Sequence, residues 1–185
     1  MKILAVSGSL RPDSWNTKVL RSAAELLPGD AELELYDGLA AVPPYDESDD
    51  VQPAPEAVER LRAAVRDADA VLFATPEYNS SIPGQLKNAL DWVSRPLATN
   101  ALRNKPVAVV GASTGAFGAV WAQAELRKVL GAMGARVVEG EVAVFHAPSH
   151  FDGEGTLVDD GLRDQLGELV AALADSARER LSIAA

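Results

Sequence analysis

Residues 2–17 read KILAVSGSLRPDSWNT, and this stretch decides the fold. Its first half, Lys2 to Ser7, is a short apolar run that predicts a buried strand ending at a glycine. Its second half leads into helical spacing of apolar residues over Trp15 to Leu27, with Ser14 as the expected N-cap. A buried strand joined to a helix by a short loop is typical of a parallel α/β sheet.

The rest of the chain continues this alternation of strand and helix. Further strands are expected over Ala31 to Tyr36, Ala70 to Thr75, Pro106 to Ala112 and Ala135 to Phe145. Further helices are expected over Glu56 to Asp67, Pro83 to Val93, Phe117 to Met133 and Leu162 to Leu181. The order predicts an α/β fold, a flavodoxin-like three-layer sandwich around a five-stranded parallel sheet of order 2-1-3-4-5. A single domain over residues 1–185 is expected.

Composition and charge exclude several classes of protein. Of the 185 residues, 48% are hydrophobic and 24% are charged, which is ordinary for a globular domain. The net charge of -10 argues against a partner that is a nucleic acid or an anionic membrane surface. The absence of cysteine excludes thiolate chemistry, so any redox chemistry must come from a cofactor. Because no signal peptide or membrane-spanning run is evident, a cytoplasmic protein is expected.

Ligands of this fold bind beyond the carboxyl ends of the strands, and the first loop at that edge predicts an anion site. Over Gly8 to Ser14, free N–H groups at a helix start favour an anion, and Arg11 adds a guanidinium suited to phosphate. No Walker or GxGxxG motif is present, so a terminal monophosphate is favoured. The alternative is that Ser14 only caps the helix and Arg11 is solvated. Further polar donors are Ser9, Ser14, Asn16 and Thr17.

The second loop, after the strand that ends at Thr75, predicts a platform for a flat aromatic ligand. Tyr78 offers a ring face, and Asn79 offers a paired donor and acceptor at the edge of such a ring. Glu77 is expected to be either a helix-cap acid or an interface residue, and Pro76 stiffens the loop. The alternative is a plain helix-entry turn.

The third loop, over Ser113 to Gly118, is rich in small residues. Small side chains let a backbone approach a ligand, and Gly115 and Gly118 permit a positive φ. The alternative is that the glycines serve only tight packing between a strand and a helix. The loop by itself therefore favours a ligand site only weakly.

Taken together, the three loops resemble the NADPH-dependent FMN reductase family, flavodoxin-like enzymes that include chromate, azo-dye and quinone reductases. The resemblance covers nearly the whole chain, and a tail over 151–159 also looks like that of the family. The matching stretches are Gly8-Ser9-Leu10-Arg11 with Ser14 and Asn16, and Pro76-Glu77-Tyr78-Asn79 through Ser81, Pro83-Gly84, Leu86-Lys87-Asn88-Ala89 and Asp91-Trp92.

The resemblance implies a non-covalently bound FMN. Its phosphate would be held by Ser9, Arg11, Ser14 and Asn16, and its isoalloxazine ring would be lined by Pro76, Glu77, Tyr78 and Asn79, with Ser113 and Gly115 at the far edge. NADPH or NADH would pass a hydride to the flavin N5 in a ping-pong cycle. A small acceptor (free flavin, a quinone, an azo compound or chromate) would then be reduced. The family also implies a homodimer or homotetramer with the flavin near a subunit boundary.

No catalytic side chain is expected, because the flavin would carry the chemistry. The alternative is a flavodoxin-like electron carrier without NAD(P)H activity, against which the arginine of the first loop and the Tyr78 loop both weigh. No metal is expected either: His146 and His150 are four residues apart, but Pro148 between them argues against a helix. The acceptor and the choice between NADPH and NADH stay open.

Overall fold

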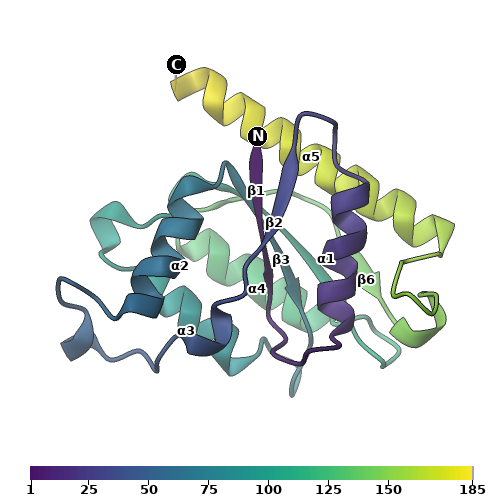
Figure 1. Cartoon of the computed structure of the whole chain (residues 1–185), viewed down its shortest axis with the longest axis horizontal. Coiled ribbons are helices and arrows are strands. Elements are labelled where there is room, and N and C mark those ends of the chain that lie inside the picture. The colour runs from purple at the N-terminus through teal and green to yellow at the C-terminus, as the bar shows by residue number, and fades with distance from the viewer. Residues whose placement is uncertain (185) are drawn as a thin grey trace.

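The computed structural model describes residues 1–184, and its middle layer is one six-stranded sheet (Figure 1). The strands are β1 (Lys2–Ser7), β2 (Glu32–Leu35), β3 (Ala70–Thr75), β4 (Pro106–Ala112), β5 (Arg136–Val137) and β6 (Val142–Val144). The helices are α1 (Trp15–Glu25), α2 (Glu56–Asp67), α3 (Gly84–Val93), α4 (Val120–Ala132) and α5 (Asp160–Ala184). No helix among the described residues is long and apolar enough to cross a membrane.

All strand pairs are parallel, and the order is β2-β1-β3-β4-β5. The predicted flavodoxin-like fold and strand order are therefore confirmed. The prediction of one fifth strand over Ala135 to Phe145 is wrong, because β5 and β6 both pair with β4 and are separated by a break. The break contains Gly140 at φ +135°, flanked by two exposed glutamates that a buried strand does not tolerate.

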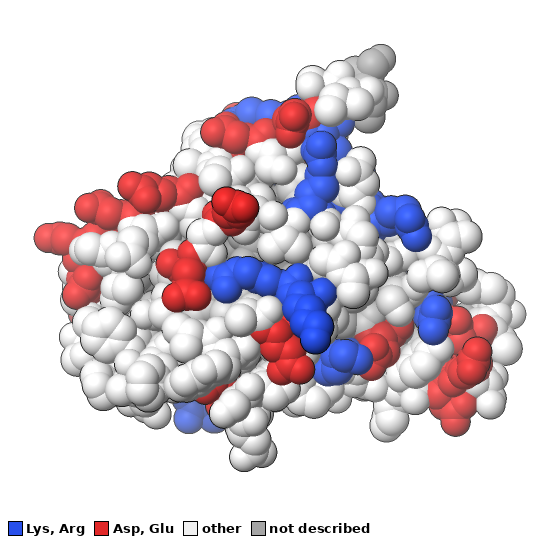
Figure 2. Space-filling model, turned by 180° about the vertical axis from the view of Figure 1, so that it is seen from behind, with Lys and Arg blue, Asp and Glu red and all other residues white. Residues whose placement is uncertain are grey.

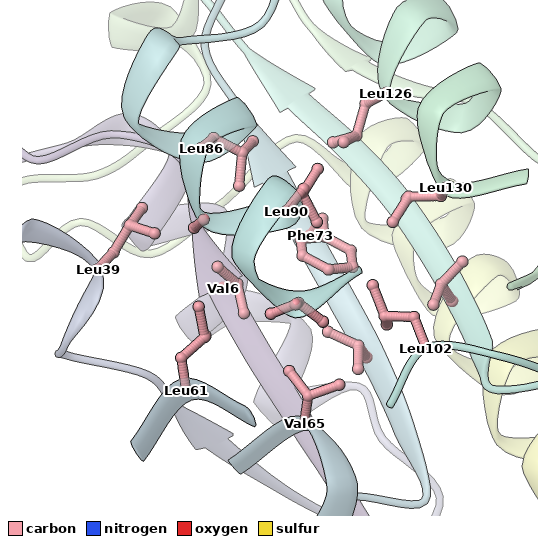
Figure 3. Close-up of a cluster of buried hydrophobic side chains, with 14 of the residues drawn as sticks. Val6, Leu39, Leu61, Val65, Phe73, Leu86, Leu90, Leu102, Leu126 and Leu130 are labelled. Atoms are coloured by element: carbon pink, nitrogen blue, oxygen red, sulfur yellow. The ribbon is translucent and has the colours of Figure 1, made fainter. Parts of the chain in front are cut away.

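The two faces of the sheet carry two hydrophobic clusters, which makes the fold a three-layer sandwich. In β1, Leu4 and Val6 point to the side covered by α2, α3 and α4, whereas Ile3 and Ala5 point to the side covered by α1 and α5. Figure 3 shows the first cluster, in which Phe73 of β3 lies among leucines of the covering helices. Because both faces are buried, the central strands are continuous apolar runs.

The connection between β2 and α2 has little regular structure but is held firmly against α3. Gln85 donates to the carbonyls of Leu39 and Val42 at 2.8 and 2.9 Å. Asn88 and Trp92 both donate to the carbonyl of Pro43, at 2.8 and 2.9 Å. The three donors are three and four residues apart and so share one face of the helix. Their bonds fix the position of α3, whose first residue follows the second predicted loop.

The acidic excess of the chain is not uniform over the surface. On the face opposite to the view of Figure 1, Lys and Arg form a band across the middle, and Asp and Glu gather around it (Figure 2). Ion pairs join basic and acidic side chains, among them Arg127 with Glu141 and Arg136 with Glu179. Such partly exposed pairs at the surface each contribute little to stability, but they interleave the charges.

Candidate functional site

The three predicted loops meet at the carboxyl edge of β1, β3 and β4 and border one open cleft of about 250 Å³. This is the edge at which ligands of the fold bind. The cleft is lined by Ser9, Arg11, Ser14, Trp15, Asn16, Pro76, Glu77, Tyr78, Ala112, Ser113 and Thr114. Most of the predicted site residues are therefore brought together, although Thr17, Asn79 and Gly115 do not line the cleft.

The first wall of the cleft combines a helix start with an exposed guanidinium. Ser14 caps α1, since its Oγ accepts from the Asn16 N–H at 3.2 Å. Within the described residues, the backbone N–H groups of Arg11, Ser14 and Trp15 have no acceptor in the chain. These N–H groups, the positive end of the helix dipole and Arg11 together match the needs of a phosphate. A cap at Ser14 and an anion site are thus compatible, because a hydroxyl that accepts still has a proton to donate.

Two of the predicted donors in this region are already engaged within the protein. The buried amide of Asn16 donates to the Ala112 carbonyl and accepts from the Ala112 N–H, both at 3.0 Å. This pair ties the start of α1 to the end of β4, two segments 96 residues apart. Thr17 donates to the Oγ of Ser7 at 3.0 Å and so supports the loop from behind.

Trp15 contributes both to the cleft and to packing beside it. Its ring lines the cleft and packs on Phe151, with ring centroids 5.2 Å apart. The Lys18 ammonium lies 4.2 Å from the centre of the same ring and pairs with Asp13 at 2.6 Å. The indole is therefore held in place from outside the cleft.

The second wall is a tight turn that presents Tyr78. Tyr78 and Ser81 exchange two backbone hydrogen bonds, of 3.0 and 3.1 Å, and Asn79 and Ser80 between them have φ of 54° and 60°. Two residues of positive φ in such a hairpin make a type I′ turn. The turn leaves the Tyr78 side chain half-exposed against the cleft and turns Asn79 out to solvent.

Glu77 caps a helix that begins 43 residues later in the chain. Its Oε2 accepts from the N–H groups of Trp121 and Ala122, both at 3.1 Å, in the first turn of α4. The N-cap position of α4 is Ala119, which has no side chain able to cap. Of the two roles considered for Glu77, the structure thus shows the helix cap.

The third wall comes directly after β4. Ser113 lines the cleft, and its Oγ accepts from the N–H of Gly115 at 3.0 Å. Of the two glycines that permit a positive φ, Gly118 adopts one, at 56°, and Gly115 does not. Thr114 also lines the cleft and was not predicted, and only its place beside Ser113 pointed to it.

A second hollow of about 340 Å³ adjoins the cleft on the side of α3 and shares Arg11 and Tyr78 with it. Exposed aromatic side chains lie on the neighbouring surface. Phe117 and Trp121 pack edge to face, with ring centroids 4.9 Å apart, and the N–H of Trp121 is one of the two that donate to Glu77. We call Tyr78, Phe117 and Trp121 the aromatic rim.

Comparison with known proteins agrees with this geometry. Residues 1–149 match the protein family described as NADPH-dependent FMN reductase. The chain belongs to this family. It is an FMN-dependent NAD(P)H oxidoreductase with FMN as its cofactor, as the resemblance of its loops implied. The electron-carrier alternative is not favoured.

Relatives with similar sequences cover nearly the whole length of the chain. The NAD(P)H-dependent FMN reductase of Pseudomonas aeruginosa is 42% identical over 174 residues, 94% of this chain and 93% of the relative. The 2-hydroxy-1,4-benzoquinone reductase of a Burkholderia species is 36% identical over 97% of this chain and 98% of the relative. Among solved structures, the NAD(P)H:(acceptor) oxidoreductase FerB of Paracoccus denitrificans superposes with a TM-score of 0.86 at 35% identity, covering 96% of this chain and 97% of that one.

Proposed function

We propose that the cleft holds FMN non-covalently, with the phosphate at the start of α1 and the ring between the second and third loops. The observation that carries this is that one cleft joins the free N–H groups and Arg11 of the first loop to the face of Tyr78. Ser9, Arg11 and Ser14 would contact the phosphate, supported by Asn16 and Thr17. Pro76, Glu77, Tyr78 and Asn79 would surround the ring, with Ser113 and Gly115 at its far edge.

Bound there, FMN supplies the hydride chemistry that the side chains lack. The protein provides position and electrostatics. The guanidinium of Arg11 and the helix start offset the charge of the phosphate. Trp15, packed against Phe151, would border the phosphate end of the cleft.

We propose further that the electron acceptor is a quinone. A related protein of similar length is named a 2-hydroxy-1,4-benzoquinone reductase, and the Escherichia coli relative, 37% identical over 92% of this chain, is named a quinone reductase. A flat acceptor suits the half-exposed ring of Tyr78 and the hollow beside it. Because NADPH and NADH are metabolites of the cell interior, we also propose a cytoplasmic location.

The aromatic rim supports a homodimer or homotetramer. Phe117 is 61% exposed and Trp121 48%, so that two large apolar rings face water beside the cleft. Neighbouring exposed apolar groups mark interaction surfaces. Light scattering should give the mass of at least two chains, and a monomer at micromolar concentration would contradict the proposal.

The activity is tested by anaerobic visible spectroscopy of the purified protein. A flavin spectrum should bleach on addition of NADPH or NADH. It should return on addition of 1,4-benzoquinone, faster than with the same concentration of free riboflavin. Equal or faster recovery with riboflavin would overturn the quinone assignment. Failure to retain FMN after incubation and desalting would overturn the proposal that the cleft holds FMN.

Replacement of Arg11 by alanine should weaken FMN binding by about thirtyfold, the equivalent of about 2 kcal/mol for a charged hydrogen bond to phosphate. The dissociation constant can be measured from the quenching of FMN fluorescence. Arg21→Ala is the matched control, because Arg21 is an exposed arginine of α1 that does not line the cleft. Equal dissociation constants for the two variants would remove Arg11 from the phosphate site.

Replacement of Tyr78 by alanine should raise the dissociation constant of FMN by about fivefold, because an aromatic contact is worth about 1 kcal/mol beyond its buried area. The KM for a quinone should also rise. Tyr78→Phe keeps the ring face and should behave as the wild-type protein in both measurements. A phenylalanine variant as impaired as the alanine variant would show that the hydroxyl, not the ring, is what matters.

A further inference from the structure

We propose that Glu77 is a positioning residue that acts on the flavin site through helix α4, and that its carboxylate does not act on the flavin directly. This inference rests on the proposed place of FMN in the cleft. It begins from the way α4 starts. Gly118 and Ala119 both have a positive φ, of 56° and 62°, so the chain enters the helix through two left-handed residues.

Such an entry leaves the helix without a cap of its own. A helix start exposes N–H groups that have no partner within the helix. In α4 the N–H of Val120 reaches the Phe117 carbonyl at 3.2 Å, and that of Gln123 reaches the Ala119 carbonyl at 2.9 Å. The two between them, of Trp121 and Ala122, both donate to Glu77. One carboxylate thus serves the donors that the helix itself leaves without a partner.

A second contact fastens the other end of the Tyr78 turn to the same helix. The Oγ of Ser81 donates to the carboxylate of Glu125, one turn further along α4. Between the two contacts, Tyr78 and Ser81 are joined by their own backbone hydrogen bonds. The turn is therefore a closed unit held at both ends, and Tyr78 cannot shift without moving against α4.

These contacts set the separation between two walls of the cleft. The second loop carries Tyr78, and the third loop, from Ser113 to Gly118, leads directly into α4. Fixing the first to the start of α4 fixes the width of the space in which the flavin ring would lie. A site organised before its ligand arrives loses less binding free energy to ordering. A change of the Glu77 side chain leaves its backbone beside the proposed ring site, so loss of the cap should weaken FMN binding through the position of α4.

The competing explanation is that the negative charge of Glu77 acts on the flavin ring itself. The structure offsets that charge locally, by two N–H donors and by the positive end of the α4 dipole. Glutamine and alanine separate the two explanations. Glutamine removes the charge but keeps an oxygen that accepts from the same N–H groups, whereas alanine removes both.

The experiment compares Glu77→Gln and Glu77→Ala with the wild-type protein, with Glu168→Gln as a control for loss of charge at an exposed position of α5. Three quantities are measured: the dissociation constant of FMN, the midpoint potential of the bound FMN, and amide hydrogen exchange of Trp121 and Ala122 in the apoprotein. We expect the alanine variant to bind FMN about tenfold more weakly and to exchange both amides faster. We expect the glutamine variant to stay within about threefold of the wild-type dissociation constant, with protected amides and an unchanged potential.

Two results would overturn the inference. One is a glutamine variant whose dissociation constant and potential change as much as those of the alanine variant, which would mean that the charge acts on the flavin. The other is wild-type FMN affinity in the alanine variant. If Glu77→Ala does not fold, Ser81→Ala removes the second contact and should weaken FMN binding by about threefold with an unchanged potential. Wild-type affinity in Ser81→Ala would then overturn the inference. Failure of the wild-type protein to bind FMN would instead overturn the proposed function.

Discussion

Replacement of Gly118 by alanine is expected to lower the free energy of unfolding by about 3–4 kcal/mol, the upper range for a single substitution. Gly118 has φ +56°, where a side chain adds strain of about 1 kcal/mol or more. An alanine Cβ there would lie 2.6 Å from the carbonyl carbon of Ala143 and 2.9 Å from its Cα. These are backbone atoms of β6, which is hydrogen-bonded to β4, so they cannot move aside without loss of the strand pair.

The matched control is the same substitution at Gly167. This glycine lies within α5, and a Cβ there meets no heavy atom within 4 Å. Gly167→Ala should therefore raise stability by up to about 1 kcal/mol, the helix propensity difference. Urea denaturation of both variants gives the two free energies. An unfolding free energy of Gly118→Ala equal to that of the wild-type protein would mean that the third loop tolerates a different backbone path. The FMN affinity of Gly118→Ala should also fall, because the substitution displaces the third loop, which carries Ser113 and Thr114.

The fold could be predicted because its central strands are buried on both faces. The bounds expected for β1, β3 and β4 agree with the structure to the residue, since each is an unbroken apolar run ended by a polar residue, proline or glycine. The prediction of one continuous fifth strand was wrong because that stretch is not an unbroken apolar run. Residues 135–145 are apolar at both ends, but the break between β5 and β6 lies at Glu139-Gly140-Glu141 in the middle. Two charged residues that flank a glycine were the signal that could have divided this strand.

The position of the site could also be predicted, because strand order alone determines which loops meet. The partners of individual side chains could not. The sequence shows that Asn16 has an amide and Glu77 a carboxylate, but their partners, Ala112 and the start of α4, lie 96 and more than 40 residues away. The resemblance implies that both residues contact FMN, and both line the cleft, but each also bonds to the backbone of another wall of the cleft. Local sequence patterns carry no information on such distant contacts.

Replacement of Arg62 by methionine is expected to cost about 3–5 kcal/mol, the usual loss when one partner of a buried ion pair is removed. The Arg62 side chain is 4% exposed, and its Nη2 donates to Asp50 at 2.9 Å and to the Trp92 carbonyl at 3.0 Å. One guanidinium thus joins α2, the end of α3 and the connection that carries Asp50. Methionine fills a similar volume but leaves the Asp50 carboxylate, itself 16% exposed, without its cation.

The neighbouring Arg60 provides the control, because it belongs to the same helix but pairs with Asp37 at the surface, where the two side chains are 57% and 88% exposed. Arg60→Met should change stability by less than about 1 kcal/mol. Adding Asp50→Asn to Arg62→Met should recover part of the loss, since the unpaired charge is then removed. Urea denaturation of the wild-type protein, Arg60→Met, Arg62→Met and the double variant gives the free energy of unfolding of each. If Arg62→Met cost no more than Arg60→Met, the buried guanidinium would contribute nothing beyond its packing. If the double variant were as unstable as Arg62→Met, the loss of stability would come from the missing bonds to the Trp92 carbonyl, and not from the unpaired carboxylate of Asp50.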